Sequence, residues 1–319
     1  MRTGQNPAKF IQKVGRPERI TVAIVTYLPF LAGYFAEGLD VLRVCLESLR
    51  ANTDRPYDLL VFDNGSAPEV VRYLGEGHAK GEIDYLILSR KNLGKGGAWD
   101  ILFPAAPGEI IAYADGDVYF RAGWLPQALA VLETFPRVGM VSSRPMRTAP
   151  DLWTGTLRWA ESQPEANLER GQFISWETFR EHDVGLGQPE SDVRQRYEET
   201  SDLRVRYRGV EALIGAVHWQ FTGYRKVLQQ FVPLSLSRPM GEVRELETRL
   251  NDAGYLRLMT TEPLTRHMAN SVPPDLGRGE SRIAITPPTG VGNRLLEWGP
   301  VRKLLLAIHN QIFRWYFRS

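Results

Sequence analysis

The chain has 319 residues, 43% of them hydrophobic, and its 39 Lys and Arg residues nearly balance 37 Asp and Glu residues. This length and composition favour a soluble globular protein with one large core or two modest ones, and the charge balance gives no support for a broad nucleic-acid-binding surface. The single cysteine, Cys45, excludes an intrachain disulfide and a Cys-rich zinc site, and its helical position favours core packing.

The N-terminal residues 1–18 are expected to form an extension that precedes the folded domain. They are polar and lack the apolar stretch of a signal peptide. No later run approaches the roughly 18 apolar residues that a membrane-spanning helix requires. The protein is therefore expected to be cytoplasmic.

Short β-rich runs bounded by Gly, Pro, Asn or Asp predict buried strands at 20–26, 59–62, 85–88, 110–114 and 138–142. Helical patterns lie between them at 39–49, 68–74, 97–103 and 125–135. This alternation predicts an α/β fold, with a mostly parallel sheet that helices cover on both faces. Ligands of such sheets bind beyond the carboxyl ends of the strands, where the polar candidates are Thr26, Tyr27, Asp63, Asn64, Asn92, Gly94, Asp115 and Asp117.

The segment "RKNLGKGGAWD" has Gly94, Gly96 and Gly97 before a helical stretch, so its backbone can approach a phosphate closely. It matches neither the P-loop spacing nor the full GxGxxG pattern. Lys95 could place a positive charge near a diphosphate, although a solvated lysine beside a Gly-rich turn is the favoured role. For Asp63, a turn or helix cap and a hydrogen-bond acceptor for a base or ribose are both open.

Asp115 and Asp117 lie one glycine apart in "IIAYADGDVYF". Two carboxylates on a tight turn supply the hard oxygen ligands that Mg²⁺ or Mn²⁺ prefers. An ordinary Asp-Gly turn is the alternative. The position of this turn beside the other polar loops favours a metal site.

These motifs, in this order, resemble those of the GT-A-fold glycosyltransferases, particularly family 2, over residues 19–268. The resemblance rests on "VAIVTY", "VFDNGS", "NLGKGGA", "DGD", "GEVRELETRLNDAGY" and "TRHM". It implies a Rossmann-like nucleotide-diphospho-sugar transferase fold and metal-dependent, inverting transfer to an acceptor hydroxyl of a glycan or lipid-linked molecule. A UDP-sugar is the favoured donor and Mn²⁺ or Mg²⁺ the cofactor. The implied donor-binding residues are Thr26, Tyr27, Asp63, Asn92, Gly94, Lys95, Gly96 and Asp115.

The same resemblance implies a cation held by Asp117, helped by Asp115 and His267, although a structural role for His267 is nearly as well supported. The usual catalytic aspartate is replaced by Val243, which shares a predicted buried helical stripe with Leu246 and Leu250. Glu242, at the helix start, is the preferred base. Glu245 is the second choice, because it can instead pair with Arg249 at i, i+4.

The predicted domain covers 19–270, with a nucleotide-binding half at 19–145 and an acceptor half at 146–270. Polar residues 161–208 predict a solvated helical surface or a mobile lid. His218 and Trp219 are the acceptor-site candidates, because aromatic faces stack on sugars, and core packing is expected for at least one of them.

Residues 271–319 predict a linker and an amphipathic C-terminal helix. From 294 onward five basic residues face one acidic residue, a net charge of 5 − 1 = +4. This helix either makes peripheral contact with a membrane or packs on protein.

Two other functions are compatible with parts of the sequence. A sugar-nucleotide nucleotidyltransferase shares the α/β pattern and the metal, but "VAIVTYLPFLAGYF" lacks the Gly-rich triphosphate loop that such an enzyme needs. A catalytically silent nucleotide-sugar-binding protein is compatible with the valine at position 243.

Overall fold

The computed structural model describes residues 4–185, 188–235 and 241–276. The strands of this part are β1 (Ile20–Thr26), β2 (Asp58–Asp63), β3 (Tyr85–Leu88), β4 (Ile110–Asp115), β5 (Val118–Phe120), β6 (Val138–Ser142), β7 (Ala166–Gly171), β8 (Asp202–Tyr207), β9 (Val210–Ile214), β10 (Gln220–Tyr224), β11 (Leu256–Met259) and β12 (Thr265–His267). The α-helices are α1 (Gly38–Asn52), α2 (Pro68–Ala79), α3 (Gly94–Ala105), α4 (Trp124–Thr134), α5 (Thr154–Ser162), α6 (Trp176–Gly185), α7 (Glu190–Glu199), α8 (Arg225–Leu228) and α9 (Gly241–Asp252). Short 3-10 turns lie at η1 (Pro7–Phe10), η2 (Gly33–Phe35), η3 (Pro150–Leu152) and η4 (Gln229–Phe231).

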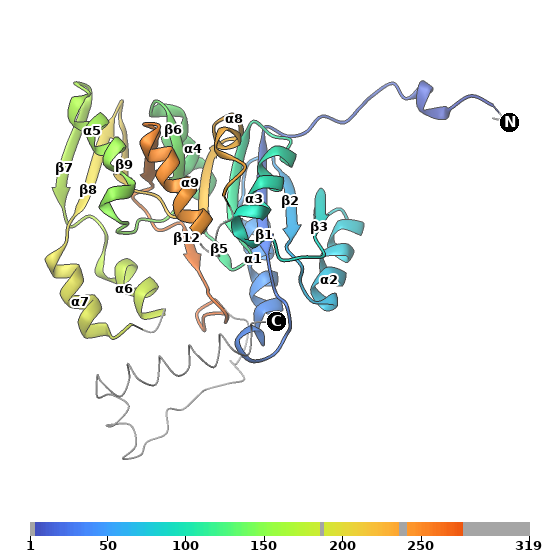
Figure 1. Cartoon of the computed structure of the whole chain (residues 1–319), viewed down its shortest axis with the longest axis horizontal. Helices are drawn as coiled ribbons and strands as arrows, with labels where there is room; N and C mark the ends of the chain where they lie inside the picture. The colour runs from blue at the N-terminus through green and yellow to red at the C-terminus, as the bar shows by residue number, and fades with distance from the viewer. Residues whose placement is uncertain (1–3, 186–187, 236–240, 277–319) are drawn as a thin grey trace, which may run out of the picture. The chain divides into compact units, whose positions relative to one another are not determined.

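A ten-stranded sheet in the order β3-β2-β1-β4-β10-β6-β11-β9-β8-β7 forms the centre of the fold (Figure 1). Strands β1 to β4 are parallel, β10 is antiparallel to both β4 and β6, and β11 is parallel to β6. Because β9, β8 and β7 then alternate in direction, seven of the ten strands point the same way. The predicted α/β fold with a mostly parallel sheet is confirmed.

One face of the sheet packs against α3 and α9, which both lie in front of it in Figure 1. Trp99 and Phe103 of α3 stack at 5.7 Å between ring centroids and meet the ring of Tyr113 on β4 edge-on. Val22 and Ile24, which alternate with the residues of this cluster along β1, are fully buried as well. The sheet is therefore covered on both faces, as predicted, and Cys45 lies in the core.

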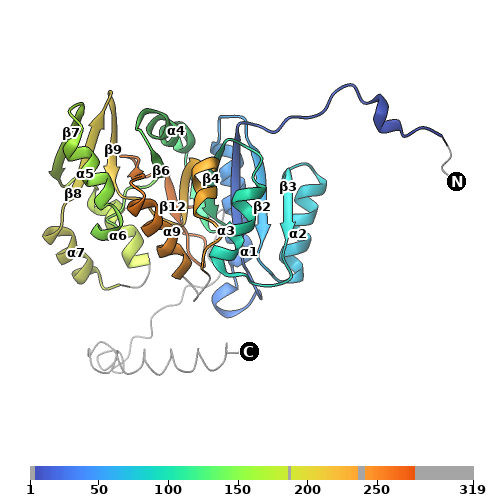
Figure 2. The same cartoon turned by 45° about the horizontal axis from the view of Figure 1, so that its top comes forward.

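Two expectations about individual segments are wrong. The strand at 85–88 is present, but it is the edge strand β3, and Tyr85 and Leu88 are 40% and 49% exposed because nothing pairs with its outer side. Residues 161–208 are not only a helical surface. They supply β7 and β8, which extend the sheet, and the helices α6 and α7 between them (Figure 2).

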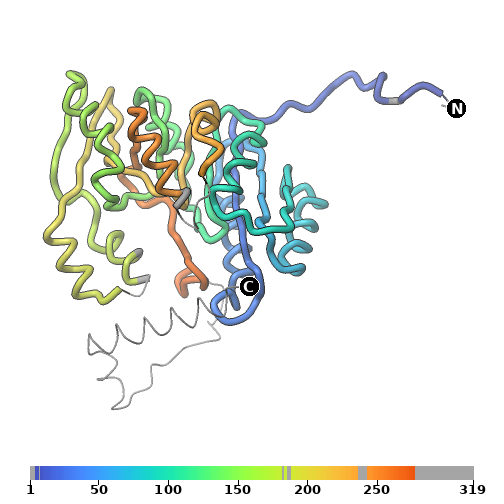
Figure 3. The backbone as a smooth tube through the Cα atoms, in the orientation of Figure 1, coloured from blue at the N-terminus to red at the C-terminus, as the bar shows by residue number. Residues whose placement is uncertain are grey.

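The chain divides into two compact units, residues 1–273 and 274–319. In the first unit, the described residues before β1 run away from the sheet as an extended segment (Figure 3). The predicted amphipathic helix from 294 onward lies outside the described residues. Within the described part, no helix is long and apolar enough to cross a membrane.

Candidate functional site

The carboxyl ends of β1, β2 and β4 surround a cavity of about 380 Å³. Because these parallel strands end at one edge of the sheet, the loops that follow them meet there. Of the predicted donor-binding residues, Thr26, Tyr27, Asn92, Gly94, Lys95 and Asp115 line the cavity, together with Asp117. These seven predicted residues thus lie on one continuous surface.

Asp63 and Gly96 do not line this cavity. Gly96 lies within the first turn of α3, which begins three residues earlier than predicted. Asp63 is fully buried, and its Oδ2 accepts the backbone N–H of Ser66 at 3.2 Å, as in the turn alternative. A contact between Asp63 and a base stays a prediction.

Asn64, next to Asp63, lines the cavity and joins two of its loops. Its Nδ2 donates to Oδ1 of Asn92 at 3.1 Å and to the carbonyl of Gly94 at 3.0 Å, and its Oδ1 accepts the N–H of Leu93 at 2.9 Å. Gly94 has a φ of +71°, a conformation that glycine adopts without strain. Asn64 therefore fixes the loop that leads into α3.

Asp115 is held by two neighbours. Nζ of Lys95 lies 2.5 Å from its Oδ2, and the Tyr113 hydroxyl donates to its Oδ1 at 2.5 Å. Burial raises the pKa of Asp115, and the Lys95 ammonium opposes that shift. The expectation of a solvated Lys95 is wrong, because its side chain is only 16% exposed.

Asp117 contacts His267, which comes from the far end of the described chain. Nε2 of His267 lies 3.2 Å from Oδ2 of Asp117. The two residues meet because β12 pairs with β5, so that His267 lies opposite Val118 and Met268 donates its N–H to the carbonyl of Asp117 at 2.8 Å. Strand β5 was not predicted, and it is too short to show a period-2 pattern.

The pair Asp117 and His267 fits a divalent cation. Oδ1 of Asp117 is buried and has no hydrogen-bond partner within the described residues, and carboxylate oxygen and imidazole nitrogen are ligands that Mn²⁺ accepts. No group of three or more His, Cys, Asp or Glu side chains in the described ranges is arranged to hold a metal. Asp117 and His267 would therefore supply two ligands, with phosphate and water oxygens completing the shell.

The protonation of His267 predicts a pH dependence of cation binding. Burial favours the neutral ring, but the hydrogen bond to Asp117 and the charges of both aspartates outweigh burial and raise the pKa of His267 above 6.5. A cation needs the neutral ring, so Mn²⁺ affinity should rise by about tenfold per pH unit below this pKa and level off above it. Titration calorimetry between about pH 6 and pH 8.5 measures this. The rise should be absent in His267→Asn, and an equally steep rise in that variant would contradict the assignment.

Helix α9 carries the candidate bases. Val243 is buried in the core with Leu246 and Leu250, as the predicted stripe requires. Glu245 accepts the N–H of Ser235 at 3.0 Å and forms an ion pair with Arg249, as the sequence alternative expected. The hydrogen bond from the Ser235 hydroxyl is the main cause that lowers the pKa of Glu245, which weakens it as a base. Glu242 lies in the first turn of α9.

Glu247, one helical turn after Val243, is a carboxylate that the sequence did not single out. It is almost fully buried and pairs with the guanidinium of Arg257, which also donates to the carbonyls of Leu152 at 2.5 Å and Ala216 at 2.8 Å. Burial raises the pKa of Glu247 while Arg257 opposes the shift. This pair anchors α9 on β11.

One of the two acceptor candidates, Trp219, lies beside the cation pair. Trp219 is 4% exposed, its ring centroid is 5.6 Å from that of His267, and its carbonyl accepts the N–H of Asp115 at 2.9 Å. Trp219 therefore packs in the core, as expected for at least one of the two candidates. His218 is half-buried.

The model of the family "Glycosyl transferase family 2" matches residues 34–185. This segment, just under half of the chain, is therefore similar to family 2 glycosyltransferase domains. The match includes Asn92, Lys95 and the Asp115–Asp117 turn of the cavity, while β1, α9 and His267 lie outside it. No curated protein sequence matches the chain.

Many solved structures have a similar fold, and three illustrate the range. They are TarS 1–349 from S. aureus (13% identity, TM-score 0.46, covering 78% of this chain and 59% of that one), mannosyltransferase PcManGT from Pyrobaculum calidifontis with GDP-Man and Mn²⁺ (19%, 0.43, 78% and 56%) and GalNAc-T7 with UDP, GalNAc and Mn²⁺ (13%, 0.48, 80% and 45%). This chain spans less than two thirds of each of these chains.

A buried ion-pair network supports the strand that carries His267. The guanidinium of Arg144, with 2% exposure of its side chain, donates to the Thr265 carbonyl of β12 at 3.0 Å and to Glu181 of α6 at 2.6 Å. Glu181 also pairs with Arg266 at 2.8 Å. Glu181 therefore lies between two arginines, one of which directly precedes His267.

Glu181→Gln should weaken Mn²⁺ binding by about tenfold, because Glu181 holds Arg266, the neighbour of His267, and groups that fix the position of a metal ligand raise metal affinity. Binding of UDP without metal should not change. Manganese electron paramagnetic resonance measures the affinity, and Glu177→Gln, an exposed position one turn earlier on α6, is the matched control. Equal Mn²⁺ affinity in the two variants would show that the network does not act on His267.

Proposed function

We propose that this protein is a metal-dependent glycosyltransferase that moves a sugar from a nucleotide-diphosphate donor to an acceptor hydroxyl, with inversion at the anomeric carbon. The observation that carries the proposal is the Asp117–His267 pair beside the cavity at the carboxyl ends of β1, β2 and β4, with Asp117 inside the segment that matches the family 2 model. A UDP-sugar is the favoured donor, and the acceptor is a glycan or a lipid-linked molecule.

Different residues of the cavity would bind different parts of the donor. Thr26 and Tyr27, which line the cavity, would contact the nucleoside, and Asn64 keeps the loop at the start of α3 in position. Lys95 neutralises Asp115 in the absence of a donor and supplies a positive charge to the diphosphate when one binds. Asp117 and His267 would hold Mn²⁺ or Mg²⁺, whose charge stabilises the negative charge of the leaving nucleoside diphosphate.

Glu242 is the proposed general base. It takes the proton of the acceptor hydroxyl as the oxygen attacks the anomeric carbon, while the bond from that carbon to the diphosphate breaks. One displacement of this kind inverts the anomeric carbon. Helix α9, which carries Glu242, is anchored on β11 by the buried Glu247–Arg257 pair.

Val243 supports a second candidate function, a nucleotide-sugar-binding protein without turnover, because the resemblance expects an aspartate at this buried position. Two measurements separate the candidates. Thermal unfolding with UDP, GDP or dTDP, each with and without Mn²⁺, should show a higher unfolding temperature for a nucleotide that binds, through mass action. Mn²⁺-dependent hydrolysis of the matching nucleotide sugar is expected for the transferase, whereas stabilisation without hydrolysis or transfer would favour the binding protein.

A further inference from the structure

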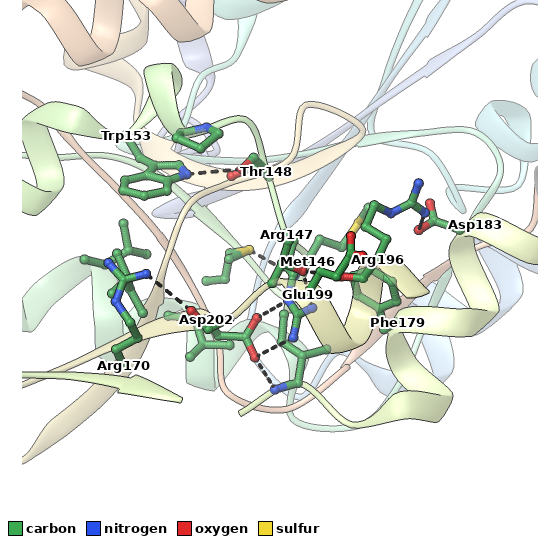
Figure 4. Close-up of a pocket in the computed structure, with 18 residues that line it drawn as sticks. Met146, Arg147, Thr148, Trp153, Arg170, Phe179, Asp183, Arg196, Glu199 and Asp202 are labelled. Carbon is green, nitrogen blue, oxygen red and sulfur yellow. Dashed lines mark hydrogen bonds and ion pairs between the residues drawn. The ribbon is translucent and has the colours of Figure 1, made fainter. Parts of the chain in front are cut away.

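A second cavity, of about 600 Å³, lies in the acceptor half (Figure 4). It shares no lining residue with the first cavity. Its walls come from the loop after β6, the β7–β8–β9 strands and the helices α6 and α7. Its volume is in the usual range for cavities that hold small ligands.

Side chains of the sheet and of the two helices pack together beside this space. Leu213 of β9 pairs with Met259 of β11, and both belong to one buried cluster with Ile174, Phe179 and Val193. The cavity is therefore bounded by the sheet on one side and by α6 and α7 on the other.

The charges that line this cavity cancel. Three arginines, Arg147, Arg170 and Arg196, accompany three carboxylates, Asp183, Glu199 and Asp202. Arg147 pairs with Asp202 at 2.6 Å, and Arg196 pairs with Asp183 at 2.5 Å. A wall whose charges are balanced in this way gives a phosphate or carboxylate ligand no net attraction.

Arg147 in particular has no capacity left for an anion. Besides Asp202, its guanidinium donates to the Tyr197 carbonyl at 2.9 Å, to the Thr200 hydroxyl at 2.5 Å and to Gln172. It also lies 4.8 Å from the ring centroids of both Phe179 and Tyr197. Arg147 is thus a fixed part of the wall.

The remaining surface suits a neutral ligand that has both hydroxyl groups and apolar faces. Figure 4 shows Trp153 and Thr148 on one side of the cavity, across from Asp202 and Arg147. Met146 and Met259 add apolar surface. The Thr148 hydroxyl is buried and has no hydrogen-bond partner within the described residues. Such a group costs free energy in the empty protein and favours a ligand that hydrogen-bonds to it.

We propose that this cavity binds a neutral saccharide unit of the acceptor, at a distance from the residues that bind the donor. The aromatic ring of Trp153 packs on the apolar face of a pyranose, and the Thr148 hydroxyl and the paired charges hydrogen-bond to its hydroxyls. The role of this cavity as an acceptor subsite rests on the proposed glycosyl transfer. The binding of a saccharide to the cavity does not depend on that proposal.

Titration calorimetry with cellotetraose, maltotetraose and chitotetraose, and with anionic tetragalacturonate for comparison, tests the proposal without UDP or metal. At least one neutral tetrasaccharide should bind, and UDP should not displace it. Ser201→Trp, at an exposed position in the lining, should weaken this binding at least about tenfold by filling the cavity. Ser191→Trp, exposed on α7 but outside the lining, is the matched control and should leave it unchanged.

Thr148→Val gives a second test that does not depend on a bulky side chain. Removal of the unpartnered hydroxyl should leave the unfolding temperature unchanged or higher, and should weaken saccharide binding by about three- to tenfold. The proposal is overturned if no neutral tetrasaccharide binds, if tetragalacturonate binds more tightly than all three, or if either Ser201→Trp or Thr148→Val binds as tightly as the unsubstituted protein.

Stabilisation by UDP with Mn²⁺ and hydrolysis of the nucleotide sugar are measured on the same variants. Hydrolysis without saccharide binding would overturn the saccharide site and leave the transferase. Saccharide binding without nucleotide binding would overturn the transferase and leave the site.

Discussion

Asp117→Ala is expected to lower Mn²⁺-dependent hydrolysis of the nucleotide sugar by about 10³-fold, because the leaving diphosphate loses the charge that stabilises it. Asp117 has an unpartnered buried Oδ1, and its Oδ2 lies 3.2 Å from His267, so no nearby carboxylate replaces it. Asp115 is engaged by Lys95 and Tyr113. Steady-state kinetics measure the loss of hydrolysis, and titration calorimetry measures the loss of Mn²⁺ affinity. The two losses should occur together.

Two further variants make this result specific. Asp117→Asn keeps the size of the side chain and should lose Mn²⁺ affinity to a similar degree, while Asp54→Ala, at an exposed position in the loop after α1, should behave as the unsubstituted protein. Retention of Mn²⁺-dependent turnover within a few-fold in Asp117→Ala would rule out Asp117 as the cation ligand.

Glu242→Gln is expected to lower kcat by about 10²- to 10⁴-fold with little change in the affinity for donor or Mn²⁺, because the substitution removes the base and leaves the donor site intact. The measurement requires an acceptor, since donor hydrolysis by water depends less on a positioned base. Exchange of an isotope label between the donor and the reaction products provides a second measurement of the transfer step.

Glu245→Gln is the comparison on the same helix. Glu245 accepts two hydrogen bonds from Ser235 and pairs with Arg249, so its removal should lower kcat by less than about tenfold. Glu247→Gln should instead destabilise the fold, because it leaves Arg257 buried without its counter-ion. A larger loss of kcat in Glu245→Gln than in Glu242→Gln would exchange the two proposed roles.

The donor half could be predicted from the sequence because its signals are local. Strands β1, β2, β4 and β6 are continuous apolar runs, and parallel strands bring their carboxyl ends together. Thr26, Asn92, Lys95 and Asp115 therefore line one cavity, as predicted. The spacing of Val243, Leu246 and Leu250 likewise identified the buried face of α9.

The features that were missed depend on distant pairings. Strand β7 has exposed and half-buried residues throughout and lies at the sheet edge, so its sequence carries little apolar alternation. Asp63 and Asn64 were both candidates from the sequence, and only the packed loops decide that Asn64 lines the cavity and Asp63 does not. The burial of Lys95 follows from its ion pair with Asp115, twenty residues away.

The pairing of β5 with β12 also determines when, during synthesis and folding, the cation site is complete. Asp117 and His267 are separated by 267 − 117 = 150 positions, so the cation site closes only after nearly all of the described chain has been synthesised and folded. A nascent or clipped chain that ends before β12 carries most of the donor cavity but only one half of the cation pair. Under the proposed function, such a chain is expected to bind a nucleotide sugar but not to cleave it.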